Sequence, residues 1–569
     1  MPDIIPTPRR RALLPAVAAL LGCALLAGCE SATNVAATGN TAAQFTHVFL
    51  TINQIWFNTS ASAVSSDSTW VKFPLPTPQT IDLVTLNNGT LSQIATQLKL
   101  TAGTYAQVMV ILADSTDALS TSAQSAGAAT NDEVDYFDTS DVSHTVPLAV
   151  LNAAQGINIG TSLTVAASSS TSIGGTATSS AATSSTTTSS TGLAATTSAI
   201  VDFDATRDLV PISLSGQPAF VLNPHPHSYN VANSGTIQGS VSLTGVSTLT
   251  AAGYPDVQVS AEALSSDGTR HVIIKTSRVG SDGTFVLYPL ATASGAPSSY
   301  DLVIHGPSIQ TVIVKAVPVT DSAPGSAAAL LNTLTLSPAT PFLVNLSTSA
   351  PAAPSSSLVG FYQTLPLSSE VPYLVEVRAV DPTSGLFASD QNLSGGSLQY
   401  GTYSSGTISL TAVNPSQGAA TYAVGAINPA YGTATLGTTV TAPANPATTV
   451  SFTLNAPPVP PGSVANAIQG TISVGTSAYD TAELFVTNNG ALVAAASLTG
   501  YLGGSQGTLS LNAIAPGGSA DTTYAPGVYY AEVWAWNSTN PTATLTRIPY
   551  GSTIDMSAGN ATGVALSIN

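Results

Sequence analysis

The stretch FTHVFLTINQIWF, residues 45–57, decides the fold class of this chain. Polar and apolar residues alternate along much of it, and β-branched and aromatic side chains are frequent, so it predicts a β-strand with one buried face. Similar stretches follow at residues 69–75, 80–89 and 98–112, and the second of them ends on the turn signal Asn88-Gly89. Only LSQIATQL, residues 91–98, is expected to form a short helix. The sequence therefore predicts an all-β protein.

Five short motifs follow Trp56 along the sequence in a recognisable order. They are W-V at 70–71, I-D-L-x-x-L-x-N-G at 81–89, L-x-A-G-x-Y at 100–105, D-F-D-A at 202–205 and L-N-P at 222–224. This order resembles the bacterial and archaeal lipoprotein-associated family called domain of unknown function 4382, over residues 43–232. The resemblance implies a β fold and an envelope location, without an activity.

One tract departs from the pattern of that family. Residues 166–198 are almost entirely Ser, Thr, Ala and Gly. Such a composition cannot bury a core, so we expect a disordered loop inserted within the domain. It could be an O-glycosylated tether, or a neutral insertion at a loop tip.

Three stretches of the remaining chain share one phrase: GTFVLYPL from Gly283, GTISLTAV from Gly406 and GTLSLNAI from Gly507. A tyrosine-led strand pattern follows each phrase, and each unit is expected to close with an alternating strand, PFLVNLST, TTVSFTLN or TGVALSIN. The repetition predicts three tandem β-sandwiches, immunoglobulin-like or prealbumin-like, at residues 234–350, 355–457 and 465–569. The joints between them are rich in proline, which predicts semi-rigid spacers and a row of domains projecting from a membrane.

The first of these repeats resembles the prealbumin-like sandwich of carboxypeptidase regulatory-like domains. The match rests on VQVSA, SDGTF and YDLVI, and it implies that Asp282-Gly283 makes a turn and that Phe285 enters the core. Some members of that family bind starch or other glycans, and many serve as spacers or pilus modules. The other two repeats share this resemblance only through the internal repeat.

Residues 1–28 have the layout of a secretory signal, with three arginines at 9–11 before a short apolar run. The run ends in LAGC, which resembles the lipobox of bacterial lipoproteins. That resemblance implies cleavage before Cys29 and a lipid on its thiol; the alternative is an ordinary signal peptide that contains a cysteine by chance. Residues 29–42 would form a tether, and the membrane would be the first partner. Glu30 is not the aspartate associated with inner-membrane retention, so we expect the outer membrane, with the protein periplasmic or surface-exposed.

Composition limits the classes of function. Only 7% of the residues are charged, whereas typical soluble proteins have roughly 25%. The formal net charge is −17, and there is no basic patch for phosphate contacts, which excludes nucleic acid as a partner. Cleavage before Cys29 would leave one cysteine, so no intramolecular disulfide is expected. No motif indicates a cofactor.

Two groups of residues are candidates for ligand binding. Trp534 and Trp536 lie two apart in EVWAWN and face one side of a strand, where they could stack on a sugar; the alternative is the core face of the last sandwich. Asp202, Asp204 and Asp208 are weak calcium candidates, and the alternative is a solvated acidic edge that guards against aggregation.

The sequence contains no convincing catalytic motif. GGSQG, residues 503–507, matches the nucleophile-elbow pattern, but its last glycine belongs to a repeat phrase and precedes a predicted strand instead of a helix. His225 and His227 could share a metal, although the flanking prolines and the lack of a third ligand favour a solvent-exposed pair.

We therefore expect a non-catalytic, lipid-anchored cell-envelope protein that acts as an extended adhesion, binding or scaffold element. One rival is a carbohydrate-binding surface lipoprotein, and the other is an enzyme of unrecognised type. A glycan or another envelope protein is the expected partner beyond the membrane.

Overall fold

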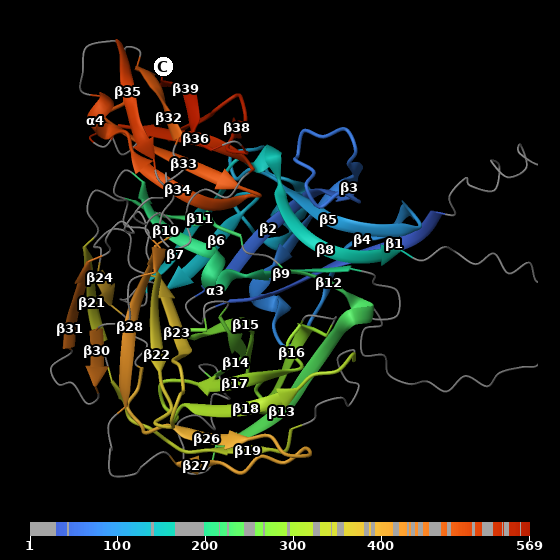
Figure 1. Ribbon diagram of the computed structural model, residues 1–569, viewed down its shortest axis with the longest axis vertical. Coiled ribbons are helices and arrows are strands. Elements are labelled where there is room, and N and C mark those ends of the chain that lie inside the picture. The colour runs from blue at the N-terminus through green and yellow to red at the C-terminus, as the bar shows by residue number, and fades with distance from the viewer. Residues whose placement is uncertain are drawn as a thin grey trace, which may run out of the picture.

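The computed structural model of the chain consists mainly of β-strands (Figure 1). The structure describes residues 30–41, 45–137, 142–165, 199–214, 217–224, 227–243, 257–265, 268–292, 296–322, 331–342, 344–349, 358–379, 386–388, 393–412, 420–428, 432–433, 438–441, 448–453, 468–474, 479–502, 507–514, 527–537, 539, 545–557 and 559–568. The predicted signal peptide, Cys29 and the tract at 166–198 lie outside these residues. Within the described ranges, no helix has the length and apolar character needed to cross a bilayer.

The strands of the first domain are β1 (Glu30–Asn40), β2 (Phe45–Asn58), β3 (Val71–Asp82), β4 (Ser92–Thr101), β5 (Gly103–Leu112), β6 (Glu133–Phe137), β7 (Ser143–Val150), β8 (Ile157–Val165), β9 (Ala199–Asp204), β10 (Leu209–Leu214), β11 (Gln217–Leu222) and β12 (His227–Asn230). They form two sheets, ordered β12-β9-β1-β4 and β10-β11-β7-β6-β2-β5-β8, with β3 paired to β2. Val35 and Phe203 of the first sheet share a core with Leu50 of the second. Residues 91–98, expected as a helix, contribute to β4 because β1 pairs with them.

The strand β1 corrects the prediction that residues 29–42 form a tether. It lies between β4, to which it is antiparallel, and β9, to which it is parallel. Val35 and Ala37 are buried in the core. Small residues in this strand allow a close approach of a neighbouring element. At Gly39, an added Cβ would lie 2.9 Å from the Leu83 side chain.

The first repeat, hereafter repeat 1, spans residues 234–336. Its strands are β13 (Ser234–Leu243), β14 (Gln258–Leu264), β15 (His271–Arg278), β16 (Thr284–Ala291), β17 (Ser299–His305), β18 (Val312–Pro318) and β19 (Leu334–Leu336). One sheet has the order β16-β13-β19, and the other contains β15-β14-β17-β18. Phe285 lies in the core between the sheets, as the sequence predicts.

Repeats 2 and 3, residues 344–453 and 468–568, have the same strand order. Repeat 2 contains β21 (Val344–Ser349), β22 (Leu358–Gln363), β23 (Tyr373–Ala379), β24 (Leu386–Ala388), β28 (Thr421–Asn428), β29 (Gly432–Thr433), β30 (Thr438–Thr441) and β31 (Thr448–Thr453). Repeat 3 contains β32 (Ile468–Val474), β33 (Thr481–Asn488), β34 (Ala491–Ser497), β35 (Gly507–Ile514), β36 (Val528–Trp536), β37 (Thr546–Pro549), β38 (Ile554–Asp555) and β39 (Ala561–Ile568). In every repeat the first strand lies between an antiparallel neighbour and the parallel last strand. The tandem β-sandwich architecture is therefore confirmed.

Two of the predicted repeat elements are wrong. PFLVNLST was expected to close repeat 1, but β21, which begins at Val344 in this stretch, opens repeat 2 because it pairs in parallel with β31. GTISLTAV was expected to match β16 and β35, but β24 takes that place beside β21. The shared Gly-Thr reflects turn chemistry, since Gly283 and Gly406 both adopt a positive φ, +83° and +84°.

The domains do not stand in a row in chain order. Repeat 3 lies against the first domain, and repeats 1 and 2 lie on the opposite side of that domain (Figure 1). Contacts between repeat 3 and the first domain confirm this arrangement. One of them is the hydrogen bond from the backbone amide of Asn158 to the backbone carbonyl of Asn489 at 3.1 Å. The predicted row is thus corrected to a closed arrangement.

The central position of β1 gives a test of the first domain. Val35→Asp should lower the free energy of unfolding by more than about 3 kcal/mol, because it buries an unpaired carboxylate. Ala32→Asp on the same strand is the control, since Ala32 is exposed and should tolerate the charge. Urea unfolding of both variants measures the difference, and equal stability for the two would show that the segment is a tether after all.

Candidate functional site

Among the described residues, most of the buried charged side chains lie at junctions between domains. Three of its 12 Lys and Arg residues are at positions 9–11, which leaves nine in the rest of the chain. Five of these nine hold their side chains at a junction: Lys275, Arg278, Lys315, Arg378 and Arg547. The candidate functional site is therefore this set of interfaces.

The tryptophan pair lies at the junction between the first domain and repeat 3. Trp534 and Trp536 are 0% and 4% exposed. They pack with Phe485 and Leu492 of repeat 3 against a small apolar patch of the first domain, which consists of Ala149, Leu151, Ala219 and Val221. In this arrangement neither indole ring is open to a sugar.

Both faces of strand β36 are apolar because alternate residues point into two different cores. Val533 and Ala535 point into the core of repeat 3. Trp534 and Trp536 point the other way and fill a second core between two domains. The two rings face the same side of the strand, as predicted. They form neither an exposed platform for a glycan nor part of the core of the sandwich.

Arg547 connects the charged part of this junction. Its Nη1 donates to both carboxylate oxygens of Asp114, at 2.8 and 2.7 Å, and its Nη2 donates to the Val150 carbonyl at 2.7 Å. Its Nε donates to Glu532, which also accepts from Trp534 Nε1 at 2.8 Å and from the Asn152 amide at 2.9 Å. Burial lowers the pKa of Arg547, but Glu532 and Asp114 outweigh burial, so the net pKa shift is upward.

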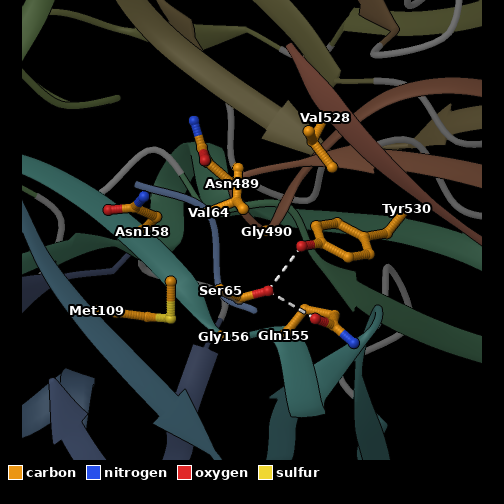
Figure 2. A pocket seen from close by; sticks show the side chains of 10 residues that line it. All are labelled: Val64, Ser65, Met109, Gln155, Gly156, Asn158, Asn489, Gly490, Val528 and Tyr530. Atoms are coloured by element: carbon orange, nitrogen blue, oxygen red, sulfur yellow. Dashed lines mark hydrogen bonds between the residues drawn. The ribbon is translucent and has the colours of Figure 1, made fainter. Parts of the chain in front are cut away.

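A small cavity borders the same junction (Figure 2). Its volume is about 20 Å³, which is room for about one water molecule. Ser65 shares hydrogen bonds there with Tyr530 at 2.6 Å and with Gln155 at 2.7 Å. The cavity is too small for a sugar, and the Ser65–Tyr530 hydrogen bond on its wall links two domains.

The junction between the first domain and repeat 1 uses one of the calcium candidates. Lys275 Nζ lies 2.6 Å from Asp202, and both side chains are buried. Asp204 accepts a hydrogen bond from the Thr206 amide and caps the helical turn α3 (Ala205–Asp208), and Asp208 accepts from the Asp204 amide at 3.1 Å. The three aspartates are buried, so the alternative of a solvated acidic edge is wrong. Among the described residues no group of three or more His, Cys, Asp or Glu side chains could hold a metal ion.

The junction between repeats 1 and 2 contains a buried glutamate with two basic partners. Glu376 lies 3.2 Å from His305 of repeat 1 and 3.3 Å from Arg378. Burial raises the pKa of Glu376, but Arg378 and His305 outweigh it, so the pKa lies below its ordinary value.

A second glutamate at this junction has its pKa shifted in the opposite direction. Glu262 of repeat 1 accepts hydrogen bonds from the Leu374 amide of repeat 2 at 3.2 Å and from Ser260 at 3.1 Å. Burial raises the pKa of Glu262 to about 8. Nearby, the ring of Tyr373 stacks on His271 with centroids 3.9 Å apart. The pKa values of two buried glutamates are therefore shifted in opposite directions within one interface.

The remaining predicted site residues do not join these clusters. His227 is exposed on β12, and its proposed partner His225 lies outside the described residues, as does Ser505 of the GGSQG motif. Gly507 begins the strand β35, as predicted. The sequence analysis did not identify the basic residues of the junctions. Their signal is the placement of scarce cations inside apolar strands, as for Lys275 in VIIKTS.

Arg547→Met should destabilise the docking of repeat 3 by about 3–5 kcal/mol, because it leaves Glu532 buried without its cation. Tryptophan fluorescence during urea unfolding reports this docking, since Trp534 and Trp536 lie at the junction. Lys99→Met is the control, because Lys99 is an exposed cation on a strand of the first domain. The same midpoint for both variants would contradict a structural role of Arg547.

Glu262→Gln should remove part of the pH dependence of stability. The buried carboxyl keeps its proton up to about pH 8, whereas an unfolded Glu loses it near about pH 4.3. The folded state therefore binds more protons between these values, and the free energy of unfolding falls as pH rises through them. Burial also raises the pKa of Glu483 to about 7, but Glu483 is present in both proteins, so the difference between the variant and the parent chain over the range between the folded and unfolded pKa values of Glu262 reports Glu262. Urea unfolding across this range should show a smaller decline for the variant, and parallel curves would refute the assignment.

Comparison with solved structures gives only weak similarity. Two B repeat units of the collagen binding protein of Staphylococcus aureus match with 6% identity and a TM-score of 0.11, covering 89% of this chain and 93% of that one. The pilus adhesin SpaC of Lactobacillus rhamnosus GG matches with 12% identity and a TM-score of 0.11, covering 61% and 45%. The full-length major pilin SpaD of Corynebacterium diphtheriae matches with 10% identity and a TM-score of 0.12, covering 60% and 98%. TM-scores this low support no inference about function.

Comparison with families is informative for the first domain. No curated protein matches the chain. Residues 32–224 match the model of a family described as a domain of unknown function, DUF4382. The match begins inside β1 and ends just after β11, so it covers most of the two-sheet domain and none of the repeats. The first domain of this chain is similar to the DUF4382 family.

Proposed function

We propose that this protein is a non-catalytic, lipid-anchored component of the cell envelope whose four β domains form one rigid body for adhesion or scaffolding. The observation that carries the proposal is a close contact between a basic and an acidic side chain at each of the three junctions: Lys275–Asp202 and His305–Glu376 are buried, and Arg547–Asp114 is partly buried. A buried pair tolerates little change in geometry, because separating the partners leaves a charge without compensation. Domains joined in this way keep a fixed arrangement, which suits a scaffold.

The anchor part of the proposal rests on the LAGC motif before β1. Strand β1 begins at Glu30, directly after Cys29. A lipid on Cys29 would therefore hold the first domain at the membrane surface without a spacer, and the repeats would extend the body from there. Sugar binding at Trp534 and Trp536 is not proposed, because both rings are buried.

The two cysteines of the chain provide a matched test of the anchor. Cys29→Ser should move the protein from the membrane fraction to the soluble fraction and abolish labelling by a radioactive fatty acid. Cys23→Ser should change neither, because Cys23 lies in the predicted signal peptide. Fractionation and labelling in a bacterial host measure both effects, and continued lipid labelling of the Cys29→Ser protein would disprove the proposed anchor.

A further inference from the structure

The connection between β24 and β28 of repeat 2, here called the excursion, is longer than the equivalent connections of the other repeats. Residues 389–420 connect β24 to β28, whereas the equivalent connections are residues 292–298 in repeat 1 and 515–527 in repeat 3. The described part of the excursion contains β25 (Leu393–Ser394), β26 (Gln399–Thr402) and β27 (Thr411–Ala412). Strand β25 pairs with β20 (Pro341–Phe342), which lies between repeats 1 and 2.

The two later strands form a hairpin that belongs spatially to repeat 1. Strands β26 and β27 are antiparallel, and Ser405 and Gly406 at the turn both have positive φ, +49° and +84°. This is the backbone signature of a tight two-residue hairpin turn. Figure 1 shows β26 and β27 beside β18 and β19 of repeat 1.

The hairpin extends the four-stranded sheet of repeat 1. Strand β26 pairs in parallel with β18 over Val312–Lys315 and Gln399–Thr402. The Gln399 amide donates to the Thr311 carbonyl at 2.9 Å, and the Tyr403 amide donates to the Lys315 carbonyl at 3.0 Å. The backbone of β18 is therefore paired on both sides, with β17 and with β26.

The hairpin also adds a side chain to the core of repeat 1. Ile408 is 5% exposed and belongs to the same apolar cluster as Phe285 and Leu334. Asn332 holds the Ile408 backbone from the repeat 1 side, accepting from its amide at 2.9 Å and donating to its carbonyl at 3.5 Å. Because it pairs with the edge of β18 and adds Ile408 to the core, the hairpin is a structural part of repeat 1, although its residues lie within repeat 2 in the sequence.

We propose that repeat 1 has a strand-acceptor site, formed by the edge of β18, the apolar cluster that surrounds Ile408 and the side-chain amide of Asn332, and that the hairpin of repeat 2 occupies it. An unpaired strand edge presents amides and carbonyls that an added strand can satisfy. The ligand chemistry follows from the contacts. The site takes an extended segment parallel to β18, followed by a tight turn and an aliphatic side chain at the position of Ile408.

A chain with an empty site tests the proposal directly. In the full chain, residues 396–412 are replaced by a short glycine linker, and a fluorescent peptide with the sequence of residues 396–412 is added. Fluorescence polarisation should show that the peptide binds the shortened chain and does not bind the intact chain, whose site is filled. The peptide with Ile408→Asp should bind at least tenfold more weakly, and the peptide with Ser409→Asp should bind normally because Ser409 is exposed.

Hydrogen exchange provides the second measurement if the shortened chain does not fold. In the intact chain with Ile408→Ala, amides of β18 should exchange at least tenfold faster, whereas amides of β2 in the first domain should be unchanged. The proposal is overturned if a folded shortened chain fails to bind the peptide, if both variant peptides bind equally, or if Ile408→Ala leaves the exchange of β18 unaltered.

Discussion

Arg547 reaches from the last repeat into the first domain, and the closed arrangement of the chain depends on the contacts around its guanidinium. It pairs with Asp114 across the junction and with Glu532 on its own repeat, and Trp534 packs beside it. The charged pair alone would give little net stability, because desolvation opposes the attraction. The indole rings of Trp534 and Trp536 supply the apolar burial, and the arginine fixes how that surface docks.

The other junctions also contain a contact between a basic and an acidic side chain. Lys275 pairs with Asp202 between the first domain and repeat 1, and Glu376 joins His305 between repeats 1 and 2. In a chain with 7% charged residues, few other charges compete with the cations at the junctions, so each cation selects its own carboxylate. Docking a repeat in the wrong place would leave that cation or its carboxylate buried and unpaired.

The sequence predicts the local features of this fold and misses those that depend on distant partners. The alternation in residues 45–57 and the turn at Gly283 identify β2 and β16 because both are properties of short segments. The tandem repeats are detectable for the same reason. Strand β1 was missed because Ala36 and Ala37 carry no strand signal of their own and become buried only between β4 and β9. The phrase at Gly406 misplaced a strand because turn chemistry repeats independently of topology.

The candidate site shows the same limit. Alternation places Trp534 and Trp536 on one face of a strand, but the surface that covers them comes from Ala149 and Val221, hundreds of residues earlier in the chain. Nothing local to either segment reveals that pairing. Likewise, Asp202 is a metal candidate in the sequence and the partner of Lys275 in the structure.

A disulfide across the closed junction tests the account most directly. Residues 30–569 contain no cysteine, and the Asn158 amide bonds the Asn489 carbonyl at 3.1 Å, which suits the Cα spacing of about 4.4–6.8 Å that disulfides need. Asn158→Cys with Asn489→Cys should form an intramolecular disulfide under mild oxidation, seen by mass spectrometry. The pair Asn158→Cys with Ser240→Cys should not, because Ser240 lies on β13, which pairs with β16 and β19 within repeat 1. Free thiols in the first pair, in a folded chain, would contradict the closed arrangement.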